Sequence, residues 1–136
     1  MSKIKFESYA DKCKKELDSI SVAWLHEAAG ELEAQVKRNT AVDTGQLKGS
    51  WDNVVDTEKL EAQVGSPLEN AIWEEFGTGQ YALNGNGRKT PWSYKDGKGD
   101  WHRTNGKRPR RAFFNAFNSL KSKLIDSLKQ RFRGLK

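Results

Sequence analysis

Gly77, Gly79 and Ala82 stand at the spacing of the dinucleotide-binding fingerprint G-x-G-x-x-[GA]. That fingerprint binds a pyrophosphate because a helix opens on its last residues and directs free backbone N–H groups at the phosphates. Here residues 83–87 are Leu-Asn-Gly-Asn-Gly, which do not start a helix. We therefore expect no nucleotide site at this position.

Other side chains that commonly perform catalysis are scattered. His26 and His102 lie in different contexts, with no cysteine or carboxylate at the spacing of metal ligands. Glu74 and Glu75 are adjacent, so their carboxylates point apart on a helical turn and do not suit paired acid–base work. No serine or cysteine stands in a nucleophile elbow, and Cys13 is expected to be a small buried residue on a helix. The sequence predicts a protein that is not an enzyme, with no catalytic residue, metal or cofactor.

A basic and aromatic constellation is the stronger signal. Arginine beside aromatic rings grips single-stranded nucleic acid by stacking and phosphate contact, yet both residue types are also enriched at protein–protein interfaces. No RNP sequence, helix-turn-helix or zinc-finger pattern accompanies them, so base-specific recognition is not expected. From the residues alone we rank a protein interface or core above nucleic acid. The members are Arg88, Lys89, Trp92, Tyr94, Trp101, Arg103, Lys107, Arg108, Arg110 and Arg111.

Composition limits the classes of protein that fit. At 136 residues the chain is expected to form a single domain, residues 1–136, with one modest core. Charged residues make up 31% of the chain, and the first residues lack an apolar run of signal-peptide length, so we expect neither a membrane span nor secretion by that route. One cysteine cannot form an internal disulfide, which agrees with a reducing cytoplasm.

The net charge of +6 is unevenly distributed. Residues 101–136 hold eleven Lys and Arg against one acid, a charge of +10, whereas residues 1–100 hold thirteen bases and seventeen acids, a charge of −4. An acidic body with a basic end favours either head-to-tail stacking of copies or contact between the basic face and nucleic acid. A helix with a lysine-rich solvent face would give the same pattern without either function.

Apolar residues recur every three or four positions across residues 6–38, a spacing that predicts one long helix ending near Asn39. Unbroken, this helix is about 50 Å long at 1.5 Å per residue. A compact domain of this size is only roughly 35–40 Å across. The helix therefore either breaks, at residues 19–21 or at Gly30, or extends onto a neighbouring copy.

The middle of the chain predicts two hairpins. Residues 51–55 and 60–64 alternate as strands, and residues 92–95 and 100–103 flank a turn that contains glycine. Between the hairpins, residues 77–91 contain little apolar surface and are expected to form a mobile loop.

Helices flank these hairpins. Asp43 followed by Gln46 has the form of a capping box before a short helix that ends near Gly49. Pro109 suits the first turn of a last helix, whose apolar stripe across residues 113–132 is expected to build the core together with Trp51. The order of elements predicts an α+β fold with a long N-terminal helix, an antiparallel sheet of about four strands and a C-terminal amphipathic helix.

Three short blocks of sequence follow one another in a fixed order. They are Val42, Asp43, Thr44 and Gly45 leading to Leu47 and Trp51; then Glu75, Phe76, Gly77, Thr78 and Gly79; then residues 106–114, with Pro109 and Phe113. In this order the chain resembles, across nearly its whole length, the tail-completion or head–tail joining proteins of long-tailed bacteriophages. Two features depart from that family: residues 70–73 replace an aromatic-Ala pair, and Arg111 replaces a frequent second proline.

The resemblance implies a late-expressed virion assembly protein of a phage or prophage. Such a protein would associate with itself into a ring, with a hexamer as the expected form, and contact tail-tube and head-connector proteins at the neck. It would be found in the host cytoplasm during assembly and then in the virion neck or tail, with no membrane partner. The basic segment could line a lumen that DNA passes through. The alternative is a small basic nucleic-acid-binding protein that uses the same arginine and tryptophan side chains.

Overall fold

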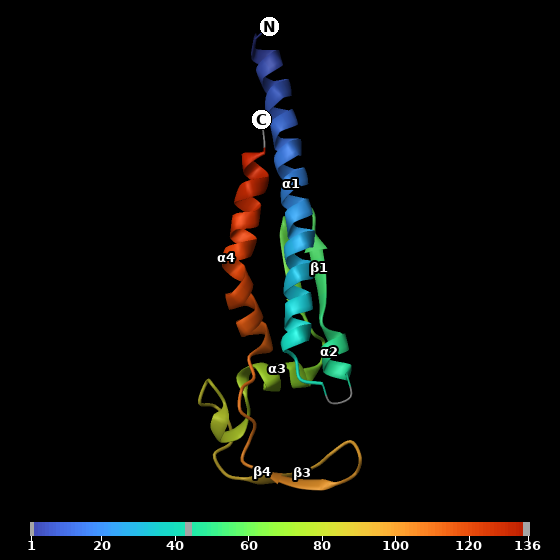
Figure 1. Cartoon of the computed structure of the whole chain (residues 1–136), viewed down its shortest axis with the longest axis vertical. Helices are drawn as coiled ribbons and strands as arrows, with labels where there is room; N and C mark the ends of the chain where they lie inside the picture. The colour runs from blue at the N-terminus through green and yellow to red at the C-terminus, as the bar shows by residue number, and fades with distance from the viewer. Residues whose placement is uncertain (1, 43–44, 135–136) are drawn as a thin grey trace. The chain divides into compact units, whose positions relative to one another are not determined.

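The computed structural model describes residues 2–42 and 45–134, and the chain divides into two compact units. Unit 1 comprises residues 1–35, 52–65 and 117–136, and unit 2 comprises residues 36–51 and 66–116. The long helices α1 (Ser2–Asn39) and α4 (Ala112–Arg133) each contribute to both units (Figure 1). The expectation of a single domain stays a prediction.

In unit 1, α1 and α4 lie side by side and antiparallel (Figure 1). The indole N–H of Trp24 donates a hydrogen bond to the backbone carbonyl of Leu124 at 2.8 Å. Glu27 also forms an ion pair between the two helices, with Arg131. Small side chains permit this close approach, since the buried residues of α1 in this unit are Ala28 and Ala29.

α1 is one unbroken helix of 38 residues, which corresponds to about 57 Å at 1.5 Å per residue. Its N-terminal part extends past the end of α4 in unit 1 (Figure 1). From Asp11 to Ser19 each side chain is exposed except Cys13, which is half-buried and so less enclosed than expected. A helical segment without packing is marginal in water, which is a physical reason to expect a neighbouring molecule there.

The apolar stripe of α4 is only partly buried, contrary to the expectation that all of it builds the core. Leu124 is buried, but Phe117 and Phe132 keep 45% and 36% of their surface exposed. The reason is geometric: α1 covers one edge of a stripe that spans more than about 100° of the helix. The side chains on the other edge stay in contact with solvent.

The first hairpin also belongs to unit 1. Its strands β1 (Asp52–Asp56) and β2 (Glu61–Gly65) pair antiparallel. Asp56 closes the turn by accepting hydrogen bonds from the backbone N–H groups two and three residues ahead, each at 3.0 Å. Asn53 donates to the carboxylate of Glu33 at 2.9 Å, which fixes the hairpin against α1.

Unit 2 contains short elements. They are α2 (Gln46–Ser50), α3 (Glu69–Phe76), the 3₁₀ helix η1 (Gly79–Tyr81), β3 (Trp92–Lys95) and β4 (Trp101–Thr104). β3 pairs antiparallel with β4, with Trp92 opposite Thr104 and Lys95 opposite Trp101. The α+β class is confirmed, and the four expected strands are present as two two-stranded sheets.

The core of unit 2 is built around Trp51, which is 7% exposed, as expected. Its indole N–H donates to the hydroxyl of Thr40 at 3.0 Å, and that hydroxyl donates to the carbonyl of Val36 at 2.7 Å. The ring of Phe113 stacks on Trp51 with centroids 6.3 Å apart. Asn39 ends α1, as expected, and its side chain donates to the carbonyl of residue 112 at 3.1 Å.

The last helix begins at Ala112, so Pro109 is not in its first turn. The backbone N–H groups of Arg110 and Arg111 donate to the carbonyl of Glu74 at 2.6 and 3.3 Å. Arg111 also has φ of 57°, in the left-handed region. These bonds hold the segment in an extended path past the proline, and the helix starts only after it.

Candidate functional site

The second and third sequence blocks pair with each other in unit 2. The N–H of Thr78 donates to the carbonyl of Lys107 at 2.9 Å, and the N–H of Lys107 donates back to the hydroxyl of Thr78 at 2.8 Å. One step further, the N–H of Gln80 donates to the carbonyl of Asn105 at 3.1 Å. Segments that are far apart in sequence therefore form a short backbone ladder.

Glycine is required at the closest point of this ladder. Gly79 has φ of 62° and Gly106 has φ of 121°, values that other residues rarely adopt. A Cβ on Gly79 would collide with the carbonyl oxygen of Asn105, and one on Gly106 would collide with that of Thr78. The close approach of the two segments therefore explains why both blocks contain glycine.

Glu75 links the same two blocks through its side chain. Its carboxylate accepts hydrogen bonds from the backbone N–H groups of Phe113 and Phe114 at 3.0 and 2.9 Å. These amides belong to the first turn of α4, where no intrahelical acceptor is available. The negative charge also suits the positive end of the helix dipole. Glu75 therefore caps α4 from α3.

The first block meets the third through the stacking of Trp51 on Phe113. Ser50, at the end of α2, shares a hydrogen bond of 2.6 Å with Ser66. Gly45 precedes α2 with φ of 84°. The capping box expected at Asp43, and the family positions Asp43 and Thr44, lie outside the described residues.

Several of the basic residues selected from the sequence are engaged inside unit 2. Lys107 forms an ion pair with Glu74. The guanidinium of Arg111 lies 4.0 Å from the centroid of Phe114 and its Nε is 3.5 Å from Glu75. These two cations support the fold around the ladder.

Two further arginines stack on aromatic rings. The guanidinium of Arg108 lies 4.7 Å from the ring centroid of Tyr81, and that of Arg88 lies 5.8 Å from Trp92. Both side chains stay exposed. Lys89, Arg103 and Arg110 are exposed as well.

The second hairpin carries an aromatic and ionic cluster at its surface. Tyr94 and His102 are opposite each other in the β-ladder and stack with centroids 5.3 Å apart. His102 hydrogen-bonds Asp96 at 2.6 Å. This bond with His102, followed by the N–H of Asp100, holds the pKa of Asp96 below its ordinary value. Trp101 is 70% exposed, so it is not a core residue.

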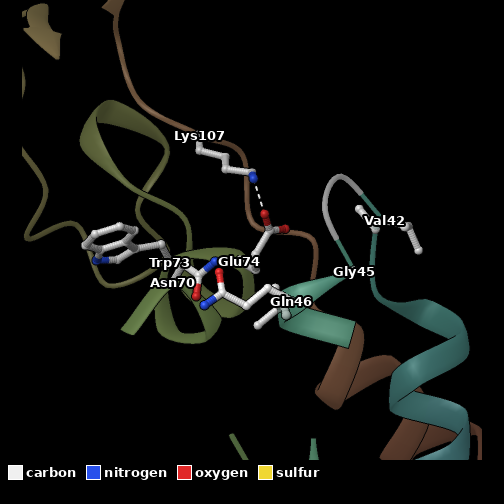
Figure 2. A pocket seen from close by; sticks show the side chains of 9 residues that line it. Val42, Gly45, Gln46, Asn70, Trp73, Glu74 and Lys107 are labelled. Atoms are coloured by element: carbon white, nitrogen blue, oxygen red, sulfur yellow. Dashed lines mark hydrogen bonds and ion pairs between the residues drawn. The ribbon is translucent and has the colours of Figure 1, made fainter. Parts of the chain in front are cut away.

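Two clefts open on unit 2. The smaller, of about 390 Å³, lies between α2 and α3, and the Glu74–Lys107 ion pair spans part of it (Figure 2). Gln46 and Asn70 bring side-chain amides to its wall, and Trp73 lies at its edge (Figure 2). Its lining combines these polar groups with apolar side chains such as Val42 and Leu47.

The larger cleft, of about 680 Å³, lies beside the ladder and the second hairpin. Its volume is within the range of sites that bind small molecules or side chains of a partner. Three aromatic side chains, one arginine and two lysines line it together with the ladder: Trp73, Trp92, Tyr94, Arg88, Lys95 and Lys107. We call this the aromatic cleft.

Within residues 2–42 and 45–134, no three His, Cys, Asp or Glu side chains are grouped so that they could hold a metal ion. In the same part of the chain, no helix is both long enough and apolar enough to cross a membrane. The arrangement can bind an acidic or apolar group by stacking, charge and hydrogen bonds.

Sequence reasoning missed two members of this surface. Trp73 is 48% exposed and lines both clefts. The ring of Tyr81 makes a cation–π contact with the guanidinium of Arg108. A signal for Trp73 was available, because Ile72, Trp73 and Phe76 are too many large apolar side chains for a helix of eight residues to bury. For Tyr81 no local signal was available, since its partner is distant in the sequence.

Comparison with known proteins identifies one family. Residues 4–77 match a family described as "Bacteriophage HK97-gp10, putative tail-component". The match contains the first sequence block and most of the second. No significant match was found among curated proteins or among solved structures.

Proposed function

The chain belongs to the HK97-gp10-like family of bacteriophage tail components, and from this premise we propose that it forms a ring that completes the tail and joins it to the head connector. It serves as a structural part of the virion without catalytic activity. It acts in the host cytoplasm during assembly and then at the neck.

The observation that carries this proposal is the meeting of the three sequence blocks in unit 2. The glycine ladder, the Glu75 cap and the Trp51–Phe113 stack use the residues by which the chain resembles tail-completion proteins. Because these residues build a scaffold, the surface left around them is available for partners. That surface is basic and aromatic, and aromatic residues and arginine are enriched at interfaces.

The uncovered lengths of helix support self-association. The stretch from Asp11 to Ser19 is exposed along α1, and Phe117, Ile125 and Phe132 are exposed along α4. Exposed apolar side chains on a helix favour contact with another protein. The stoichiometry of the ring, with six copies as the expectation, is part of the proposal.

The test is disruption of the gene in the phage or prophage that carries it, followed by electron microscopy. We expect filled heads and separate tails to accumulate, and complementation with the wild-type gene to restore joined particles. Mass spectrometry of purified virions should find the protein in stoichiometric amounts. Normal yields of joined, infectious particles from the disrupted gene would overturn the proposal.

A second candidate function, non-specific binding of nucleic acid, is favoured by the exposed face of the second hairpin. Trp101 lies opposite Lys95 in the β-ladder, and Arg103 is on the same strand as Trp101. An exposed indole beside cations can stack on a base and contact phosphate. Measured DNA affinity decides between the two functions.

A further inference from the structure

The aromatic cleft of unit 2 has the properties of a receptor for an acidic and apolar segment. Trp73 and Tyr94 are 48% and 46% exposed at its wall, so they offer apolar surface that the folded unit does not cover. Arg88 stacks on Trp92 within it and Lys95 lines it, both exposed. Lys107 is already paired with Glu74, so Arg88 and Lys95 are the cations available to an incoming group.

The first hairpin, in unit 1, has the complementary properties. From Asp52 to Glu61 it contains four acids and one lysine, a charge of −3. Glu58 and Glu61 are exposed near its turn, and Val54 and Leu60 are exposed by 66% and 38%. The turn thus presents the apolar side chain of Leu60 between two glutamates in the sequence, and the adjoining strand presents Val54.

Leu60 is the strongest indication that this turn binds something. It has φ of 54°, a conformation in which an L-residue with a side chain is strained and glycine or asparagine is favoured. Backbone strain of this kind is typical of residues whose side chain has a function. Leu60 combines this backbone conformation with a side chain that keeps 38% of its surface exposed, so apolar surface remains for a partner to cover.

We propose that the first hairpin of one copy docks into the aromatic cleft of the next copy, with Leu60 as its apolar anchor. Leu60 packs against Trp73 and Tyr94 of the receiving copy. Glu58 and Glu61 face Arg88 and Lys95 of that copy. This contact rests on the self-association in the proposed function and supplies its interface.

A contact of this kind is heterologous, because the two copies contribute different surfaces. After two copies pair, one of them still has a free cleft and the other a free hairpin, so further copies can add until the assembly closes into a ring. A symmetric dimer, in which both copies use the same patch, would stop at two. The docking therefore accounts for a ring in a way that the exposed helices alone do not.

The test uses the full-length chain and three double variants, with self-association measured by sedimentation across a concentration series. The hairpin variant is Glu58→Lys with Glu61→Lys, and the cleft variant is Arg88→Glu with Lys95→Glu. The control is Arg103→Glu with Arg110→Glu, which matches the cleft variant in charge but alters exposed sites of unit 2 that do not line the aromatic cleft. Each of the first two alone should weaken association at least about tenfold, as expected for like charges brought together.

Mixing the hairpin and cleft variants in equal amounts should restore association, because each reversed surface then meets its complement. In a mixture with the control, the net charges are the same, but the reversed hairpin still meets a basic cleft. A label on the hairpin variant should therefore show that the control associates with itself, whereas the hairpin variant can only cap the ends of its assemblies. The docking would be overturned if the hairpin variant or the cleft variant alone associated as strongly as the wild type. It would also be overturned if the wild type were monomeric, or if the control restored association of the hairpin variant as well as the cleft variant does.

The Leu60→Gly variant distinguishes a role of Leu60 in self-association from a role in folding. We expect an unchanged or higher Tm, because strain is relieved, together with association weakened by about tenfold or more, as for a central anchor. A lowered Tm with unchanged association would show that Leu60 serves the fold and would overturn its role.

If docking fails while gene disruption still prevents joining, only the interface is wrong. If disruption leaves joining intact, the proposed function is wrong whatever the state of association.

Discussion

Glu75 shows at the level of one residue how a sequence block acts in this fold. The block that contains Glu75 was recognisable in the sequence, but its role was not. The carboxylate of Glu75 accepts hydrogen bonds from the backbone amides of Phe113 and Phe114, which are on another helix. Its neighbour Glu74 turns the other way, toward Lys107. The expectation that the two carboxylates point apart agrees with these contacts.

Replacing Glu75 tests the cap. Glu75→Ala removes the acceptor from two amides at the start of α4, and we expect the free energy of unfolding to fall by about 1–2 kcal/mol, the usual cost of losing a helix cap. Glu75→Gln keeps one acceptor oxygen, so it should lose less. Urea denaturation of the three proteins measures the difference. Equal stability of the alanine variant and the wild type would show that the carboxylate does not cap the helix in solution.

The stability of the turn in the second hairpin should depend on pH through Asp96, and the hydrogen bonds of Asp96 determine the sign of this dependence. Because the pKa of Asp96 is lowered in the folded protein, its charged form stabilises the turn above the ordinary pKa of aspartate. That contribution is lost as pH falls through the lowered pKa. We expect the His102 ring resonances and the stacking on Tyr94 to change on acidification below pH ~4.

Asp96→Asn is the matched control, since it keeps an oxygen for the turn but cannot change its charge. In this variant the acid transition of the hairpin should disappear. An identical acid transition in wild type and variant would assign it to another group.

At the scale of elements, local signals were sufficient for the hairpins. The turn at Asp56 is closed by contacts within three residues, and the turn at Asp96 within four, so alternation and turn composition located both strand pairs. The start of α4 was not predictable in this way. Pro109 is a local helix signal, but the bonds from Arg110 and Arg111 to Glu74 are long-range and override it.

The candidate site was predictable only in part for the same reason. Residue type identified the basic and aromatic set, but not which members are engaged inside the fold. Lys107 and Arg111 are held by acids on α3, whereas Lys89, Arg103 and Arg110 are exposed. These ion pairs join residues that are far apart in the sequence, so the spacing of residues along the chain does not predict them.

The glycine-rich segment 77–91 allows a prediction about element stability. Its first part is bonded into unit 2, since Thr78 and Gln80 donate to the ladder and Leu83 donates to the carbonyl of Phe76 at 2.9 Å. Residues 84–91 are mostly exposed. Hydrogen exchange should therefore be slow at residues 78, 80 and 83 and fast across 84–91 in the isolated protein, because exposed segments with few buried contacts open most easily.

On assembly, the amides of 84–91 should become slower to exchange if this segment contacts a neighbour. Uniform protection across 77–91 in the monomer would contradict the predicted mobility. Unchanged exchange in assembled particles would exclude the segment from the interface.

For the whole molecule, the uneven distribution of charge predicts how the protein binds DNA. The excess of bases lies in residues 101–136, and Lys89, Arg103 and Arg110 are exposed cations of unit 2. In a neck ring these side chains contact DNA only as it passes, so free DNA should bind weakly, without sequence preference and with a steep dependence on salt from counterion release.

Changing Lys89, Arg103 and Arg110 together to Gln should leave the Tm unchanged, because none of the three is buried. The control is Lys121, Lys129 and Arg133 changed to Gln, which removes the same charge from α4 and is used as a control once sedimentation shows wild-type self-association. If the basic surface of unit 2 lines the passage, the first variant should lower the yield of infectious particles and the control should not. DNA affinity is measured at ~150 mM salt, where exposed charges are screened beyond about 8 Å. Submicromolar, sequence-selective binding by wild type, with normal head–tail joining in the first variant, would instead favour the nucleic-acid-binding function.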